Sequence, residues 1–261
     1  MKEYYIVLPS NVISEEFPNN KTNNYSTSLP SNLELGGNGW EVCLSEITYP
    51  HSWYNIDVNC FIEIINVVSS TLQGKEVINR SRDRAVVPPG YYNDGYEIID
   101  ILNDLLRFRG KSSRFNYNAS NNIISVSIVG GEHIKLNTDF AAILGFGSRR
   151  FFDWINKESA IVSASNGLDL NLKTHNIFIY SDIVRYTLVG NTYAPLLRMV
   201  PTYNENRSKY VTEQFVNRYY HSLNSSYIKQ ISISILDDQG DPIKFRSGKV
   251  SVVLHFRQVN I

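Results

Sequence analysis

Cysteine is scarce in this sequence, with only two copies, Cys43 and Cys60, in 261 residues. Both lie in apolar runs of strand-like composition, which is typical of buried free thiols. A disulfide would need an oxidising compartment, and nothing in the sequence indicates one. We therefore expect two buried free thiols and no disulfide framework.

Long hydrophobic runs are absent as well. No segment approaches 18 consecutive apolar residues, so the sequence predicts no membrane-spanning helix and no membrane partner. Residues 1–9 lack the long apolar core of a secretory signal peptide. The glycosylation-type triplets at residues 24–26 and 118–120 are therefore interpreted as chance matches in an Asn-rich chain.

The sequence also lacks an excess of charge of one sign. Lys and Arg total 25, Asp and Glu total 25, and charged residues make up 19% of the chain. A nucleic-acid-coating protein normally carries a basic excess or a basic patch, so the composition gives no strong nucleic-acid signal. A short basic run at residues 80–84 could contact nucleic acid or an acidic partner, but at zero net charge we interpret it as a solvated loop.

Motifs for phosphate binding and for nucleophilic catalysis are missing too. Residues 36–39 are rich in glycine but lack the spacing and the lysine of a phosphate-binding loop, so they predict a turn before Trp40. Residues 145–150 could form an anion-binding loop. A helix-ending glycine followed by a solvated basic turn is the preferred interpretation of that segment. No serine, cysteine or threonine lies in a nucleophile motif.

The titratable residues do not form a recognisable site. None of the five histidines pairs with another histidine, a cysteine or a carboxylate at a metal-ligand spacing. They are His51, His133, His175, His221 and His255. Asp237, Asp238 and Asp241 lack the bidentate Glu of a calcium-binding hand, since Gly248 occupies the twelfth loop position. The carboxylates at positions 94, 97, 100 and 104 are interpreted as a solvated helix face. We therefore expect no enzyme, no catalytic residue, no metal and no cofactor.

Alternation of apolar and polar residues is what the sequence does contain. Ile231, Ile233 and Ile235 alternate with serines, and residues 250–257 alternate in the same way. Such alternation places one set of side chains on each face of a strand, so both runs predict half-buried antiparallel strands. Residues 237–242, Asp-Asp-Gln-Gly-Asp-Pro, have turn chemistry, and we expect the two strands to pair through that turn.

Further strand-like runs occupy most of the chain. They are residues 4–8, 29–35, 40–49, 60–68, 176–184, 186–189 and 196–200. Many short strands with long, irregular connections favour a two-sheet jelly roll over a tight up-and-down barrel. We therefore predict a mainly β protein, a single antiparallel jelly-roll sandwich formed by residues 1–87 and 156–261.

Residues 88–155 have a different pattern of apolar and polar residues, with a helix-like stretch among strand-like ones. Asp94 followed by Glu97 predicts an N-cap with its reciprocal carboxylate. Apolar residues then follow at the spacing of one helix face, namely Ile98, Ile101, Leu102 and Leu105. Strand-like runs at 113–117, 123–129 and 133–136 and a short helix near 140–144 complete the pattern. The segment predicts a small α+β insertion.

An ordered succession of short segments covers nearly the whole chain and carries a resemblance. The segments are residues 4–11, 17–20, 40–42, 46–50, 52–56, 89–91, 144–146, 180–184, 195–198, 238–245 and 254–257. They begin with Tyr-Tyr-Ile-Val-Leu-Pro-Ser-Asn and end with Leu-His-Phe-Arg. The succession resembles the minor capsid (penton) proteins of Polinton (Maverick)-type elements and of related adintovirus- or virophage-like viruses.

The resemblance implies a structural protein without catalytic residues. It implies a single jelly roll that forms a homopentamer at the fivefold vertices of an icosahedral shell, beside a double jelly-roll major capsid protein. Such a chain would be located in the virion after assembly inside the host cell. Tyr203, Arg218, Tyr219 and Tyr220 lie in loop-like sequence and are candidate interface residues, with ordinary sheet-edge packing as an equal alternative. The rest of the interface is not assigned.

Two other classes of function remain open at this point. The main alternative is a jelly-roll module that binds a carbohydrate or a receptor. An enzyme such as a hydrolase ranks third, and it would require a cleft that brings several of the scattered His and Asp residues together. We expect no such cleft.

Overall fold

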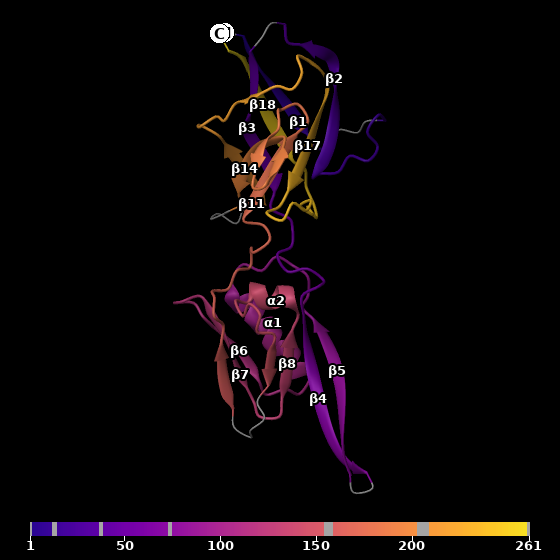
Figure 1. The fold of residues 1–261 in the computed structure, drawn as a ribbon, viewed down its shortest axis with the longest axis vertical. Coiled ribbons are helices and arrows are strands. Elements are labelled where there is room, and N and C mark those ends of the chain that lie inside the picture. The colour runs from indigo at the N-terminus through magenta and orange to yellow at the C-terminus, as the bar shows by residue number, and fades with distance from the viewer. Residues whose placement is uncertain are drawn as a thin grey trace. The chain divides into compact units, whose positions relative to one another are not determined.

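The structure is a computed structural model that describes residues 2–11, 15–36, 39–72, 75–153, 159–202 and 209–259. It is mainly antiparallel β, in agreement with the predicted fold class, and it contains a jelly-roll-like β sandwich (Figure 1). The chain divides into two compact units. The sandwich unit consists of Met1–Trp53 and Lys173–Ile261, and the inserted unit is Tyr54–Leu172.

Two antiparallel sheets form the sandwich unit. The first has the order β1-β18-β3-β15, with β16 also paired to β3. Its strands are β1 (Glu3–Pro9), β3 (Trp40–Pro50), β15 (Tyr210–Gln214), β16 (His221–Ser222) and β18 (Ser251–Gln258). The second sheet has the order β14-β11-β17-β2. Its strands are β2 (Asn24–Glu34), β11 (Asn176–Ser181), β14 (Leu196–Pro201) and β17 (Tyr227–Leu236). A separate hairpin joins β12 (Thr187–Val189) to β13 (Thr192–Ala194).

The sandwich core follows from the alternation in the sequence. Ile231, Ile233 and Ile235 of β17 are fully buried, and they share one hydrophobic cluster with Leu254 and Phe256 of β18. Each such side chain contributes about 1.5–3 kcal/mol when it leaves water. Burial of two apolar strand faces against each other is therefore what holds the two sheets together.

The predicted pairing of the last two long strands is wrong. β17 pairs with β11 and β2, whereas β18 pairs with β1 and β3, so they lie in opposite sheets. The turn at residues 237–242 does form, since the Asp237 carboxylate accepts bonds from the backbone N–H groups of Gln239 and Asp241. The chain then crosses to the other sheet, because the apolar faces of both strands are buried when they face each other across the core.

The inserted unit has its own sheets and its own core. One sheet has the order β5-β4-β8-β9 and the other has the order β10-β7-β6. The first contains β4 (Phe61–Leu72), β5 (Lys75–Val86), β8 (His133–Leu136) and β9 (Phe151–Asp153). The second contains β6 (Arg114–Asn118), β7 (Ile123–Ile128) and β10 (Ala160–Ser163). The helices are α1 (Gly95–Phe108) and α2 (Thr138–Ile143), and both contribute to a second hydrophobic cluster.

The predicted N-cap of helix α1 forms at Asp94, but the Glu97 carboxylate accepts from the backbone N–H of Asn93 and not from that of Asp94. The Asp94 carboxylate accepts bonds from the backbone N–H groups of Tyr96 and Glu97, at 2.9 and 3.1 Å. Its buried face is rotated slightly from the expected one. The fully or nearly fully buried side chains are Ile98, Ile99, Leu102 and Leu106, while Ile101 and Leu105 are only partly buried. Neither described helix has the length and apolarity needed to cross a bilayer.

The inserted unit of the structure is longer than the predicted insertion at 88–155. Residues 54–87 and 156–172 belong to the inserted unit. The reason is strand pairing, since β4 pairs with β8 and β10 pairs with β7. Alternation in these strands resembles that of the sandwich strands, so the sequence pattern alone does not show which sheet they join.

Candidate interaction surface

The outer face of the β1-β18-β3 sheet carries the candidate site. Segment 215–220, which follows β15, lies against this face. Its Arg218 and Tyr220 side chains contact His255 and Arg257 of β18. We call the region the tyrosine–arginine surface. Its members are Glu3, Tyr5, Val7, Glu41, Arg198, Phe215, Val216, Arg218, Tyr219, Tyr220, His255 and Arg257.

His255 lies at the centre of this surface and is 1% exposed. Its Nδ1 atom is 2.7 Å from the Tyr220 hydroxyl group, and its Nε2 atom is 3.1 Å from Glu3 Oε2. Because a carboxylate accepts but does not donate, we assign the proton to Nε2, which leaves Nδ1 to accept from Tyr220. The Tyr5 ring stacks on the imidazole with ring centres 4.4 Å apart. Burial lowers the pKa of His255, so the neutral ring is favoured.

Arg257 of β18 and Arg218 of the segment itself both join segment 215–220 to the sheet. Arg257 donates to Glu41 Oε2 from Nε and Nη2, and its guanidinium lies 3.4 Å from the centre of the Tyr220 ring. Arg218 Nη2 donates to the Tyr5 hydroxyl group at 3.3 Å. Cation–π contacts of this kind contribute about 0.5–1 kcal/mol at exposed sites. Segment 215–220 is thus fixed on the sheet by aromatic and arginine contacts.

Arg198 of β14 links the second sheet to this segment. Its guanidinium lies 3.9 Å from the centre of the Phe215 ring and 4.4 Å from that of Tyr219. Its Nη1 donates to the Asn217 carbonyl group at 2.8 Å. Burial lowers the pKa of Arg198. A cation enclosed by two rings holds both rings in fixed positions on the surface.

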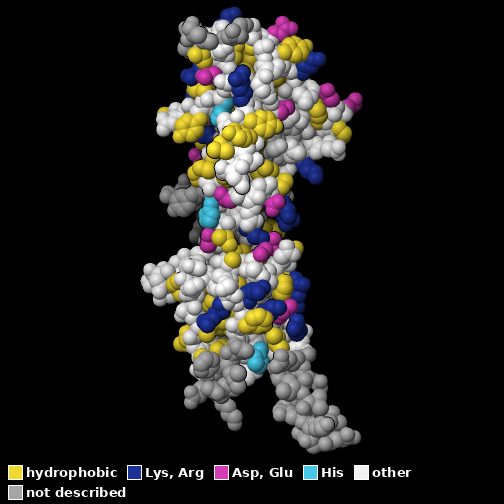
Figure 2. Space-filling view, in the orientation of Figure 1, with side chains coloured by type: hydrophobic (Ala, Val, Ile, Leu, Met, Phe, Trp, Pro, Cys, Tyr) yellow, Lys and Arg dark blue, Asp and Glu magenta, His cyan; other side chains and the backbone are white. Residues whose placement is uncertain are grey.

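Large apolar side chains remain exposed on this surface. Val216 is 94% exposed, Tyr219 62%, Val7 59% and Tyr5 52%. A groove of about 580 Å³ lies beside them, lined in part by Tyr5, Phe215, Val216 and Arg218. Figure 2 shows hydrophobic side chains on the visible face of the sandwich unit, interspersed with Lys, Arg and His. Aromatic and arginine side chains with exposed apolar area are typical of protein–protein contact sites.

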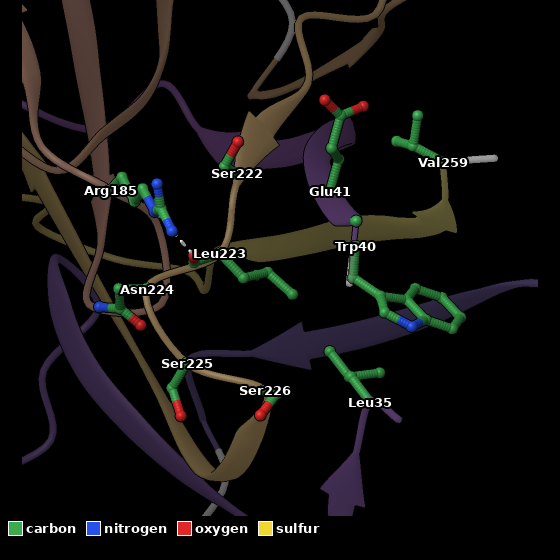
Figure 3. Close-up of a pocket in the computed structure, with 11 residues that line it drawn as sticks. Leu35, Trp40, Glu41, Arg185, Ser222, Leu223, Asn224, Ser225, Ser226 and Val259 are labelled. Carbon is green, nitrogen blue, oxygen red and sulfur yellow. Dashed lines mark hydrogen bonds between the residues drawn. The ribbon is translucent and has the colours of Figure 1, made fainter. Parts of the chain in front are cut away.

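A second concave region of the sandwich unit has a volume of about 480 Å³ (Figure 3). Leu35, Trp40 and Leu223 supply its apolar wall. Arg185, Ser222, Asn224 and Ser226 supply polar groups. Arg185 Nε donates to the Leu223 carbonyl group at 3.2 Å. None of these residues belongs to a site that the sequence predicts.

In the part of the chain that the structure describes, no three His, Cys, Asp or Glu side chains lie close enough to share a metal ion. Asp238 instead accepts bonds from the backbone N–H groups of His175 and Asn176, which fixes the start of β11. His221 contacts the Leu197 carbonyl group, and His51 packs edge-on against Trp53.

The second glycine-containing motif, residues 145–150, follows directly on the end of helix α2. In α2, the backbone N–H of Gly145 donates to Ala142 and that of Phe146 to Ala141, so Gly145 ends the helix as expected. Arg149 and Arg150 are exposed, and Arg150 donates to the Thr138 hydroxyl group. Within the first motif, residues 37 and 38 lie outside the described residues.

The basic run at 80–84 is a strand, and the predicted loop is wrong. It lies in β5, paired with β4. Arg84 stacks on Phe61 at 3.7 Å from the ring centre, while Asp83 pairs with Arg109 at 2.7 Å. Successive side chains of a strand point to opposite faces, so neighbouring charges are separated. Composition alone does not show this separation.

Three of the four interface residues named from the sequence lie together. Arg218, Tyr219 and Tyr220 all belong to the tyrosine–arginine surface, and Tyr203 lies outside the described residues. The sequence interpretation missed Tyr5, Arg198 and the roles of His255 and Arg257. Alternation in the sequence could have indicated three of these residues, because it places Tyr5, His255 and Arg257 on the outward faces of β1 and β18. Cys43 and Cys60 are both buried, as expected.

Comparisons with known proteins find proteins of similar fold but no matching sequence family. No protein-family model matches the sequence, and no curated protein matches it. A chain in the structure of the Sputnik virophage matches with 12% identity and a TM-score of 0.48, over 98% of each chain. The mavirus penton protein matches with 14% identity and a TM-score of 0.53, over 99% of this chain and 100% of that one. The chain is therefore similar in fold, along its whole length, to the penton protein of mavirus.

Proposed function

We propose that this chain is a structural protein of a viral shell, a minor capsid (penton) subunit. In this proposal it forms a homopentamer at the fivefold vertices of an icosahedral shell, next to a double jelly-roll major capsid protein. The observation that carries the proposal is the full-length similarity in fold to a protein that is named a penton protein. The similarity extends over both units, and a sandwich domain alone would not cover the whole of either chain.

The tyrosine–arginine surface supplies a chemical basis for contact between subunits. A ring of identical subunits needs heterologous contacts, in which one surface of a subunit meets a different surface of the next. Buried aromatic and arginine side chains contribute most of the binding free energy in such interfaces. Val216 and Tyr219 are exposed in the single chain, and the contacts of Arg198 and Arg218 hold the surrounding rings in place.

The finer parts of the proposal concern the source of the shell. The order of sequence segments supports a Polinton (Maverick)-type element or a related adintovirus- or virophage-like virus. The location that follows is the virion, with assembly inside the host cell.

Native mass spectrometry of the purified chain tests the assembly. A pentamer has five times the chain mass of 29.8 kDa. Val216→Glu adds a carboxylate to an exposed apolar position on the proposed contact surface and should shift the population to monomer. Val58→Glu changes an equally apolar side chain that is 61% exposed in the inserted unit, and it should leave the pentamer intact. A wild-type chain that stays monomeric even when co-produced with its major capsid partner would contradict the proposal.

A further inference from the structure

The region in Figure 3 is built on two chain segments that are paired with each other. Val184 and Leu223 form an antiparallel bridge. The backbone N–H of Arg185 donates to the Ser222 carbonyl group at 3.0 Å, and that of Asn224 donates to Ile183 at 3.0 Å. These bonds fix the wall that carries the polar side chains before any ligand is present, so little ordering is needed on binding.

Arg185 is an exposed cation whose side chain is held at one atom. Its Nε atom is held by the Leu223 carbonyl group at 3.2 Å, as the dashed line in Figure 3 shows. Among the described residues no carboxylate pairs with Arg185, and its two Nη groups have no other hydrogen-bond partner there. A guanidinium fixed at Nε presents the remaining N–H groups as a planar fork, the geometry that matches a carboxylate.

Hydroxyl and amide groups lie beside this arginine. In the described part of the chain, the hydroxyl groups of Ser222 and Ser226 have no hydrogen-bond partner. The Asn224 amide donates from Nδ2 to the Asp182 carbonyl group, which leaves its oxygen as an acceptor. Figure 3 places Ser222, Asn224, Ser225 and Ser226 along one connected stretch of chain beside Arg185. Several donors and acceptors on one short segment suit a ligand that carries several hydroxyl groups.

The opposite side is mainly apolar. Trp40 is supported by Tyr4, with ring centres 5.1 Å apart, and lies on the same side as Leu35 in Figure 3. The Leu223 side chain extends toward Trp40. Glu41 lines the region as well, and its charge is balanced by the bond to Arg257 at 2.9 Å. The volume of about 480 Å³ lies within the range of small-molecule sites.

We propose that this region binds a sugar that carries a carboxylate. The carboxylate contacts the Nη groups of Arg185, the ring hydroxyl groups contact Ser222, Asn224 and Ser226, and the apolar face of the sugar packs toward Trp40. The proposal does not depend on the role in a shell. It assigns the chain a second property, recognition of acidic glycans, at a region that borders the tyrosine–arginine surface at Glu41.

Saturation-transfer NMR and calorimetry with 3′-sialyllactose, and with lactose as the neutral probe, test the site on the full chain. We expect the wild-type chain to bind sialyllactose and to bind lactose at least tenfold more weakly, since only the former supplies a partner for Arg185. Arg185→Gln should weaken sialyllactose binding by about tenfold or more, because a charge-assisted bond contributes about 1.5–3 kcal/mol. Ser226→Ala should weaken it by about two- to fivefold, since it removes one neutral hydrogen bond.

Arg82→Gln is the matched control, because it removes the same charge from an exposed position in the inserted unit. It should leave binding unchanged. Circular dichroism and thermal unfolding show whether each variant is folded, and Ser226→Ala, a milder change, keeps the test valid if Arg185→Gln does not fold. Equal binding of lactose and sialyllactose, unchanged binding by Arg185→Gln, or no binding of sialyllactose by the wild-type chain would each overturn the proposal.

Discussion

The Tyr220 hydroxyl group donates a hydrogen bond of 2.7 Å to Nδ1 of His255, a side chain that is 1% exposed. The two residues belong to different parts of the chain, since Tyr220 ends the segment after β15 and His255 lies in the middle of β18. The bond joins a connecting segment to the sheet beneath it. As assigned, this bond requires the neutral form of the buried histidine, whose Nδ1 atom then accepts.

The first prediction concerns pH. Burial lowers the pKa values of His51, His221 and His255 below the ordinary 6.5, so the folded chain binds fewer protons than the unfolded chain near that pH. The resulting stability is present above pH 6.5 and is lost as the pH falls below it. Around His255, Arg218 and Arg257 disfavour the protonated form and Glu3 favours it. Thermal unfolding should show a lower Tm at pH 5.5 than at pH 7.5.

His255→Gln tests the share of this effect that comes from one ring. The variant cannot titrate, so its Tm should change less than that of the wild type over the same interval. An identical pH dependence in both chains would show that His255 does not contribute.

The second prediction concerns the hydroxyl group of Tyr220. Tyr220→Phe keeps the ring contact with Arg257 but leaves Nδ1 of the buried His255 without its shortest partner. We expect a loss of about 1–3 kcal/mol in the free energy of unfolding, measured by urea denaturation. Tyr219→Phe is the control, since that ring is 62% exposed and a hydroxyl group in water costs almost nothing to remove. Equal effects of the two changes would contradict the role assigned to the bond.

The third prediction concerns Gly145. Its φ of +82° lies in the left-handed region, and a Cβ atom there would meet the Asn166 carbonyl oxygen at 2.1 Å. Gly145→Ala should therefore add a steric clash to the backbone cost of about 1–2 kcal/mol that a left-handed residue carries. Gly110→Ala shares the backbone conformation, with φ of +67°, but has nothing within 4 Å of the added atom. Urea denaturation should show a clearly larger loss for Gly145→Ala, and similar losses would argue against close contact at Asn166.

The fourth prediction concerns the two hydrophobic clusters, each of which draws its residues from one unit. Ile233→Ala opens a cavity in the sandwich unit, and Leu102→Ala opens one in the inserted unit. Each should cost about 2–5 kcal/mol. Hydrogen exchange measured by mass spectrometry should show faster exchange mainly in the unit that carries the substitution. Equal acceleration in both units after either change would show that they unfold as one.

Sequence pattern predicted the strands better than their partners. The alternation at residues 231–235 and 250–257 correctly gave two half-buried strands, because side-chain direction in a strand is a local property. Pairing depends on which apolar face covers which, and that placed β17 and β18 in opposite sheets. For the same reason, the inserted unit begins at residue 54 and not at the predicted residue 88, since β4 pairs with β8.

The candidate site was predictable only in part, for a related reason. Tyrosine and arginine in loop-like sequence pointed to Arg218, Tyr219 and Tyr220. The rest of the surface comes from residues far apart in the chain, such as Glu3 and His255, which meet because β1 and β18 are neighbours. Nothing local to either residue indicates that contact. The region around Arg185 likewise depends on the bridge between Val184 and Leu223.

Electron microscopy of particles formed when this chain is co-produced with the proposed partner, a double jelly-roll major capsid protein, tests the central claim most directly. The account predicts five copies of this chain around each fivefold vertex, with the tyrosine–arginine surface buried between neighbouring copies. Shells that close with another protein at those vertices, and with this chain absent from them, would contradict it.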